Sequence, residues 1–323
     1  MTEQSIDEKI DLILGPVSDL ITNFVFSSFN FFGENVPFIV CWLLFASLFF
    51  TIYFKFLNIR YFKRAISVAF GKYDNENHPG EITHFQSFTA AMSGTIGLGN
   101  IAGVAVAISI GGPGAMIWMI ITAFFGMTLK FVEVSLGHKY RVIHSDGTVS
   151  GGAIRYLSDG LGNYGLPRFG KFLAIFFAIC CIGGSFGGGN MFQANQAFQQ
   201  IVEASGGLNS PLYNKGWLGG SIFAIIVGLI IFGGIKSIGR VTEKLVPLMA
   251  LVYVSSCILI IGNNFFLLPE TFKLIFAGAF SLEATTGGVI GSMIAGIKRA
   301  VFSNESGIGS APIAYAPAKS DNH

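Results

Sequence analysis

The sequence predicts an all-α polytopic membrane protein. Only 12% of the 323 residues are charged, 52% are hydrophobic and the mean hydropathy is +0.62, whereas a soluble domain carries about 25% charged residues. A soluble globule with this composition would lack polar surface, and the aromatic content excludes disorder. A net charge of +2 without a basic block excludes a nucleic-acid-binding protein. The 42 glycines indicate helices that pack closely against one another.

The elements follow in chain order. Residues 1–36 predict an interfacial amphipathic helix, because apolar residues from Ile10 to Val25 recur at helical spacing. A leading span follows at 37–57. Six more apolar segments reach the length of about 20 residues that a membrane crossing requires, at 85–110, 113–138, 172–203, 216–235, 245–263 and 286–316.

The distribution of Lys and Arg predicts the orientation of these spans. Thirteen of the twenty basic residues lie in the connections after spans one, three and five. The N-terminus and the connections after spans two, four and six hold only Lys9, Lys215 and Lys273. Because basic connections stay on the cytoplasmic side, we expect the N-terminus to lie outside.

The second span, 85–110, contains a predicted helix break. Three glycines fall within residues 94–99, and each costs a helix about 1 kcal/mol relative to alanine. Thr95 and Asn100 compete for backbone hydrogen bonds at the same place. The flanks at 85–92 and 101–110 are apolar, so we expect two half-helices joined by unwound backbone. Such backbone is tolerated at membrane depth only where it lines a cavity or binds something.

The seventh span repeats this pattern. Aligned without gaps, SGTIGLGNIA from Ser93 matches SNESGIGSAP from Ser303. The copies lie five crossings apart, so they run in opposite directions. An inverted repeat of broken helices is typical of secondary transporters, which hold substrate and coupling ion between the breaks. The first repeat would run over 85–263, and the second would begin at 285–323.

Several patterns allow other interpretations. G-x-G-x-x-A at Gly97 and G-x-S-x-G at Gly183 match nucleotide-binding and hydrolase motifs, but neither has the strand context or the partner residues. The chain is therefore not expected to be an enzyme. The amides from Asn190 to Gln196 form either a pocket wall or contacts between helices. Glu305 and Arg299 are either functional ionisable groups within the span or a pair that fixes the second break. Lys130 and Glu133 are interpreted as a pair that snorkels to the membrane surface.

Four long motifs carry a family resemblance: SGTIGLGNIAGVAVAISIGGPGAMIWM from Ser93, GGGNMFQANQ from Gly187, GGIKSIGRVTEKLVPLMA from Gly233 and FSNESGIGSAPIA from Phe302. The chain resembles the alanine/glycine:cation symporter family. The resemblance implies sodium-coupled symport of alanine or glycine across an inner membrane by alternating access. It also implies a leucine-transporter-like five-plus-five inverted repeat preceded by one leading helix, with Na⁺ as coupling ion and no other cofactor.

The resemblance also implies the site residues. The substrate would contact the first break, one residue of span four and the second break, through Thr95, Gly97, Gly99, Asn100, Gln193, Ser303, Asn304, Gly307 and Ser310. Candidate sodium ligands are Gly94, Thr95, Asn100 and Asn304. The sequence does not decide whether the substrate is alanine or glycine, or whether the coupling ion is Na⁺ or H⁺.

The C-terminus departs from the family pattern. His323 follows directly after the first helix of the second repeat, so the inverted-repeat logic leaves about 140 residues and four helices unaccounted for. Alternatives are therefore a non-functional truncated remnant, or half of a split symporter whose C-terminal half is encoded separately. A channel-like membrane protein is a further alternative. We expect the 323-residue chain alone to insert into a membrane without accumulating alanine.

Overall fold

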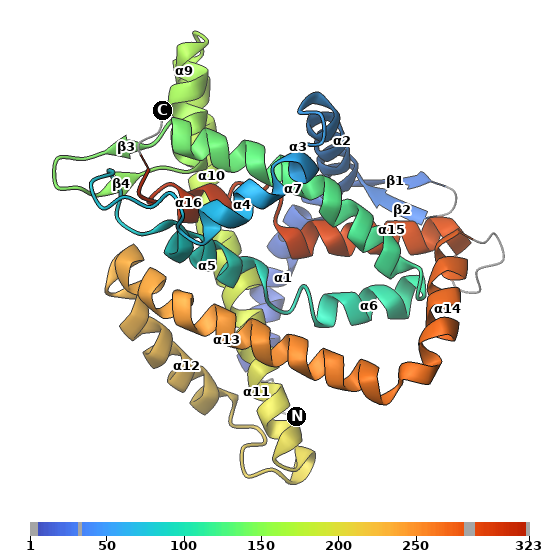
Figure 1. Ribbon diagram of the computed structural model, residues 1–323. Coiled ribbons are helices and arrows are strands. Elements are labelled where there is room, and N and C mark those ends of the chain that lie inside the picture. The colour runs from blue at the N-terminus through green and yellow to red at the C-terminus, as the bar shows by residue number, and fades with distance from the viewer. Residues whose placement is uncertain (1–5, 32–33, 281–287, 321–323) are drawn as a thin grey trace.

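The computed structural model describes residues 6–31, 34–280 and 288–320 and is mostly helical (Figure 1). The expected interfacial helix and the start of the second repeat fall partly outside these residues, at 1–5, 285–287 and 321–323. Two short antiparallel hairpins interrupt the expected all-α chain. β1 (Ser28–Phe31) pairs with β2 (Glu34–Pro37), and β3 (Val142–Ile143) pairs with β4 (Val149–Ser150).

The N-terminal part runs from α1 (Ile6–Val25) through the first hairpin into α2 (Phe38–Tyr53), which occupies the predicted leading span. Residues 28–31 and 34–37 are thus strand, where the sequence predicted an interfacial helix over 1–36. After α2 the chain turns at Lys55 and Phe56, both with positive φ. The short helices α3 (Leu57–Arg60) and α4 (Phe62–Ala69) follow, and Asn58 of α3 donates a 3.0 Å hydrogen bond to the carbonyl of Phe124.

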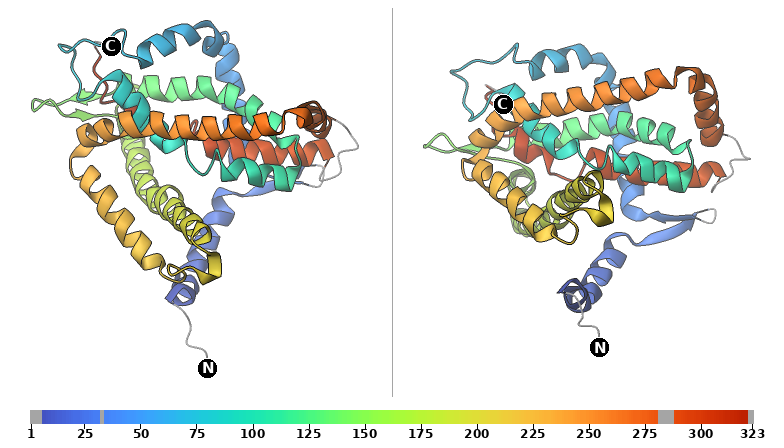
Figure 2. Two further views of the ribbon diagram at one scale, coloured as in Figure 1. Left: turned by 60° about the horizontal axis from the view of Figure 1, so that its bottom comes forward. Right: turned by 90° about the horizontal axis from the view of Figure 1, so that it is seen from below.

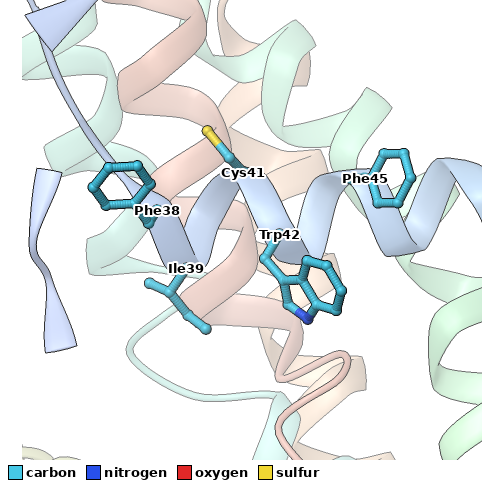
Figure 3. Close-up of a pocket in the computed structure, with 5 residues that line it drawn as sticks. All are labelled: Phe38, Ile39, Cys41, Trp42 and Phe45. Atoms are coloured by element: carbon cyan, nitrogen blue, oxygen red, sulfur yellow. The ribbon is translucent and has the colours of Figure 1, made fainter. Parts of the chain in front are cut away.

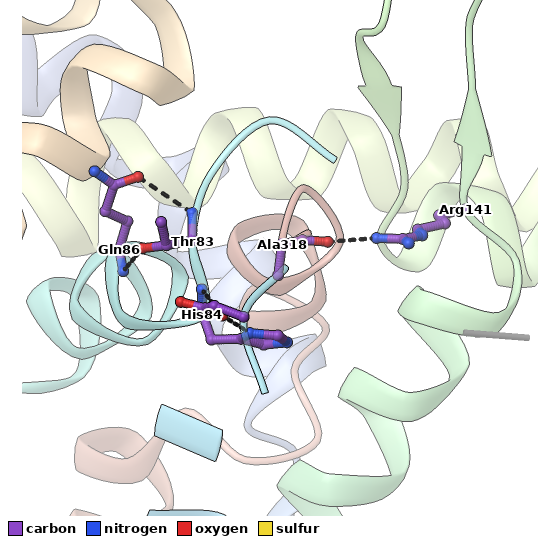
Figure 4. Close-up of polar contacts among 6 residues, drawn as sticks. Thr83, His84, Gln86, Arg141 and Ala318 are labelled. Carbon is purple, nitrogen blue, oxygen red and sulfur yellow. Dashed lines mark hydrogen bonds and ion pairs between the residues drawn. The ribbon is translucent and has the colours of Figure 1, made fainter. Parts of the chain in front are cut away.

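The first broken helix consists of α5 (His84–Thr95) and α6 (Ala102–Gly111). A capping box begins α5: the backbone N–H of Gln86 donates to the Thr83 hydroxyl, and the Gln86 side chain accepts from the Thr83 N–H, both at 3.2 Å (Figure 4). The helix ends within the glycine-rich segment that predicted the break.

α7 (Ala115–Lys139) is continuous and leads into the second hairpin. The chain then winds through α8 (Ala153–Arg155), η1 (Tyr156–Gly160) and α9 (Leu161–Asn163). Predicted span four is longer than expected. It comprises α10 (Pro167–Gly184), the π-helical segment η2 (Ser185–Met191) and α11 (Phe192–Ala204).

The remaining helices complete the bundle. After η3 (Gly207–Asn209) come α12 (Gly216–Ile231), α13 (Gly234–Asn263), η4 (Phe265–Leu267) and α14 (Leu268–Phe280). α13 begins 11 residues before the predicted span at 245, because apolarity marks the membrane core and not the helix end. The second broken helix is α15 (Gly288–Asn304) with α16 (Ala311–Tyr315).

The two broken helices lie side by side and run antiparallel (Figures 1 and 2). α15 packs on α6, and α16 packs on α5, so the first half of each contacts the second half of the other. α7 packs along both α15 and α16. Small residues permit this close approach: Ala107, Ala115 and Ala300 form a buried cluster with Met119. A Cβ on Gly296 would lie 2.5 Å from the Ala115 carbonyl oxygen.

The outer surface is apolar, as expected of a membrane protein. Among the described residues, α7, α10 and α13 are long and apolar enough to cross a bilayer, and α2, α6 and α12 are shorter apolar helices. Large side chains along α13 point outward, including Leu251, Ile258 and Leu259. On α2, one helix face lines a shallow apolar pocket through Phe38, Ile39, Cys41, Trp42 and Phe45 (Figure 3).

Candidate functional site

The first helix break touches the end of α15, directly before the second break. A Cβ on Gly99 would lie 3.0 Å from the Cα of Ser303 and 3.3 Å from its hydroxyl oxygen. Ser303 is buried in the last turn of α15. Gly99 therefore allows the backbone of the first break to contact the end of the first half of the second broken helix.

The first break, residues 96–101, leaves backbone groups unpaired. Among the described residues, only turn-like bonds span it, from the N–H of Asn100 to the carbonyl of Gly97 at 3.1 Å and from the N–H of Gly103 to the carbonyl of Leu98 at 2.8 Å. The carbonyls of residues 93–96 accept no hydrogen bond from any residue that the structure describes. Because unpaired carbonyls are costly in an apolar bundle, this segment is suited to a ligand that supplies the missing contacts.

Two polar side chains of the first break differ in their bonding. The Thr95 hydroxyl donates back to the carbonyl of Ala91 at 3.2 Å, within its own helix. The Asn100 Oδ1 atom is buried and has no hydrogen-bond partner among the described atoms. At the start of α6, the N–H groups of Ala102 and Val104 donate no backbone hydrogen bond to a described residue. Oxygen atoms and N–H groups are therefore both available around this break.

Gln193 is the amide that the structure brings to the first break. A Cβ on Gly97 would lie 3.3 Å from both the Nε2 and the Oε1 atoms of Gln193, which stands in the first turn of α11. Gln196 donates to Asn195 at 3.4 Å in an exposed position instead. Of the amides between Asn190 and Gln196, Gln193 therefore has the placement that a pocket wall requires.

The second break, residues 305–310, is held by α7. Glu305, Gly307 and Gly309 all adopt positive φ, at 50°, 84° and 82°. The Lys130 ammonium donates to the carbonyl of Asn304 at 3.2 Å and to the carbonyl of Glu305 at 3.1 Å. These are carbonyls that the end of α15 leaves without intrahelical partners, and a cation is favoured at this helix terminus.

Glu133 supports the other side of the same break. Its Oε2 atom accepts a 3.0 Å hydrogen bond from the N–H of Gly309, just before α16. Lys130 Nζ lies 3.9 Å from Glu133 Oε1, and Glu133 is 5% exposed. The interpretation of these residues as a snorkelling pair is therefore wrong. A cation at the end of α15 and an anion before α16 come from one turn of α7. Two charged residues three apart within an apolar span were the signal that could have shown this role.

The Glu305 carboxylate lies between the two breaks. Its Oε2 accepts a 3.1 Å hydrogen bond from the Ser310 hydroxyl and lies 3.8 Å from the position of a Cβ on Gly94. Arg299 has neither a hydrogen bond nor an ion pair within the described part of the chain. Glu305 thus closes the second break through Ser310, and the alternative of a pair with Arg299 is not what the structure shows.

The remaining candidate residues face α7. The Asn304 amide nitrogen lies 3.9 Å from the position of a Cβ on Gly126. Gly307 lies against Leu129 and Leu43, which a Cβ there would meet at 2.7 and 2.8 Å. The structure thus brings together Gly97, Gly99, Gln193 and Ser303. Asn304 lies toward α7, and Gly307 lies toward α7 and α2. Of the four sodium candidates, Gly94 lies near Glu305 and Asn100 offers a buried oxygen.

Comparisons with known proteins identify the family of this chain. The sodium:alanine symporter family matches residues 19–323. The chain is 42% identical over 287 residues to the sodium/alanine symporter AgcS of Methanococcus maripaludis, covering 88% of this chain and 61% of that protein. It is 34% identical to "Probable sodium/glutamine symporter GlnT" of Bacillus subtilis, with 85% and 55% covered. It is also 34% identical to "Amino-acid carrier protein AlsT" of the same organism, with 90% and 60% covered.

The family and these relatives are transporters and not enzymes, as the lack of catalytic motifs predicted. The chain spans about three-fifths of the length of the curated relatives it matches. With the family match over almost the whole chain and 42% identity to one member, the chain belongs to the sodium:alanine symporter family.

Proposed function

We propose that this chain supplies both broken helices of a sodium-coupled symporter for a small neutral amino acid, alanine or glycine. The observation that carries the proposal is the contact of Gly99 in the first break with Ser303 at the end of α15, in broken helices that run antiparallel. The unwound backbone of the first break meets the last turn of α15, directly before the second break. That arrangement is typical of the binding site of a secondary transporter.

The available groups suit a zwitterion and a sodium ion. The N–H groups at the start of α6 lie at the positive end of a helix dipole, where a carboxylate is favoured. The unpaired carbonyls of residues 93–96 and the Asn100 oxygen are hard ligands of the kind that Na⁺ takes. Gln193 beside Gly97 offers an uncharged donor and acceptor. The side chains of alanine and glycine are small enough for a site lined by Gly97 and Gly99.

The inverted repeat and the orientation are part of the same proposal. The antiparallel pair supports a five-plus-five architecture preceded by the leading helix α2, with the first repeat over 85–263 and the second starting at 285. The bias of Lys and Arg supports an inner-membrane protein with its N-terminus outside. The symport activity is proposed for an assembly of family length, with the remaining two-fifths supplied in the same chain or by a separate C-terminal half.

The decisive experiment measures ligand binding. The C-terminal portion of the Methanococcus maripaludis relative is joined after residue 323, and binding of labelled alanine, glycine and glutamine is measured by scintillation proximity in Na⁺, in K⁺ and at low pH without Na⁺. We expect sodium-dependent binding of alanine or glycine, abolished by Gly99→Leu. Binding that is indifferent to Na⁺, or retained in Gly99→Leu, would contradict the proposal.

Topology is tested separately. Single cysteines at 63, 155, 240 and 215 are labelled from outside intact cells with a membrane-impermeant maleimide, in a background that lacks the native cysteines. We expect labelling only at 215. Labelling at 63 or 240 would show that the orientation is reversed.

A further inference from the structure

The two broken helices are tied together at one end of the bundle. The segment that follows α16 pairs with the loop before α5 through a parallel bridge between Ile82 and Ala318. The N–H of Lys319 donates to the carbonyl of Ile82 at 2.8 Å, and the N–H of Glu81 donates to the carbonyl of Pro317 at 2.8 Å. The start of one broken helix and the end of the other therefore form one hydrogen-bonded unit.

Arg141 fastens this unit to α7. It stands between the end of α7 and β3, and its guanidinium donates to four main-chain carbonyls: Ala316 at 2.9 Å, Ala318 at 2.6 Å, Ser320 at 2.6 Å and Pro79 at 3.4 Å. Figure 4 shows the Arg141 side chain reaching across to Ala318. A guanidinium presents five N–H groups in a planar fork, which suits several acceptors at once. No ion pair from a described carboxylate competes for it.

The second hairpin closes around the same place. The N–H of Val149 donates to the Glu81 carboxylate at 2.8 Å. Gly151 lies directly against the side chain of Ala316, with no room for a Cβ between them. The contacts to Arg141 and to the hairpin thus join the two broken helices to α7.

We propose that Arg141 is a latch that holds this end of the broken-helix pair closed against α7, and that its release lets this end open. The inference rests on the proposed function, because a symporter must open each end in turn. All of the described acceptors of Arg141 are backbone carbonyls near the end of the bundle, and Arg141 itself is half-buried. On release, water can therefore replace each partner, which makes the contact reversible in a way that a deeply buried ion pair is not.

The experiment measures the accessibility of α5 beneath the latch. Ser87 is 1% exposed, and its hydroxyl donates to the carbonyl of Ala314 at 2.9 Å. Ser87→Cys is introduced into the chain with its four native cysteines replaced, and maleimide labelling rates are followed in nanodiscs. We expect Arg141→Ala to raise the rate at least about tenfold, as the loss of several charge-assisted hydrogen bonds implies. Arg141→Lys keeps the positive charge but lacks the planar guanidinium. Its labelling rate should therefore lie between that with Arg141 intact and that of Arg141→Ala.

Two controls make the result decisive. Lys139→Gln removes a neighbouring charge from the last turn of α7 and should leave the rate unchanged. Ala107→Cys reports on the buried core at 0% exposure and should stay unlabelled in every variant. An unchanged rate at Ser87→Cys in Arg141→Ala would overturn the proposal. A rise at both reporters would also overturn it, because Arg141 would then support the whole fold. Neither sodium nor an amino acid is added, so the outcome is independent of the ligand-binding test.

Discussion

The two helix breaks have similar sequences, but their backbones are held in different ways. In the first break, residues 96–101, the neighbouring carbonyls are unpaired and Asn100 has a buried oxygen without a partner. In the second break, residues 305–310, Lys130 and Glu133 of α7 bond the backbone on both sides. The first break therefore offers unpaired polar groups to a ligand, whereas the protein itself satisfies much of the second. We infer that the first break is the one a ligand orders, and that the second is preformed.

The largest effect is expected when the side chain that supports the second break is removed. Lys130→Met deletes the hydrogen bonds to the carbonyls of Asn304 and Glu305 and leaves the Glu133 carboxylate buried without a counter-ion. Breaking a buried pair in this way costs about 3–5 kcal/mol, measurable as a loss of free energy of unfolding in detergent. Lys139→Met, on the same helix but exposed, is the control. The double variant Lys130→Met/Glu133→Leu should recover part of the loss, and no recovery would argue against the pairing.

The next effect concerns ligand binding in the family-length assembly. In saturating sodium, alanine at 100 times its dissociation constant should stabilise the folded protein by about 2.7 kcal/mol. By hydrogen exchange, we expect the protection to increase over residues 96–104 and to change little over 305–310, which α7 already holds. An equal increase in protection over both segments would contradict the inference that the ligand orders only the first break.

Two glycines of the first break should differ in their tolerance of a methyl group. Gly99→Ala meets the backbone of Ser303, which cannot move aside, so it should cost about 2 kcal/mol of stability. Gly97→Ala meets the end of the flexible Gln193 side chain and should cost less than about 0.5 kcal/mol. Chemical unfolding of the two variants measures both values. A larger loss of stability for Gly97→Ala than for Gly99→Ala would show that the first break does not contact Ser303 as described.

The smallest effect compares two serines. Ser310→Ala removes the hydrogen bond to Glu305 across the second break and should cost about 1 kcal/mol. The hydroxyl of Ser93 only donates back to Ala90 within α5, so Ser93→Ala should be close to neutral. Thermal unfolding of the pair tests whether side chains stabilise the second break more than the first.

Sequence reasoning located both breaks but not what surrounds them. The glycines of 94–99 and 307–309 predicted interruptions, and the helices end at Thr95 and Asn304. The same reasoning misread Lys130 and Glu133, because the composition of α7 does not show which residues pack against it. Nor did the sequence show that Gly307 lies against Leu129 and Leu43. Arg141 was counted only as a positive charge, since its partners are backbone carbonyls that carry no sequence signal.

The sequence by itself determined the class of protein, the family and the position of each helix break. These properties depend on local chemistry: apolar length decides what can cross a membrane, and glycine decides where a helix fails. Only the tertiary structure decided which break has unpaired backbone and which is supported, and what Arg141 binds. Those outcomes depend on contacts between residues more than 170 positions apart, such as Lys130 with Asn304 and Arg141 with Ala316. Hydrogen bonds of this kind arise from the packing of α7 against α15 and α16, which the pattern within each segment does not contain.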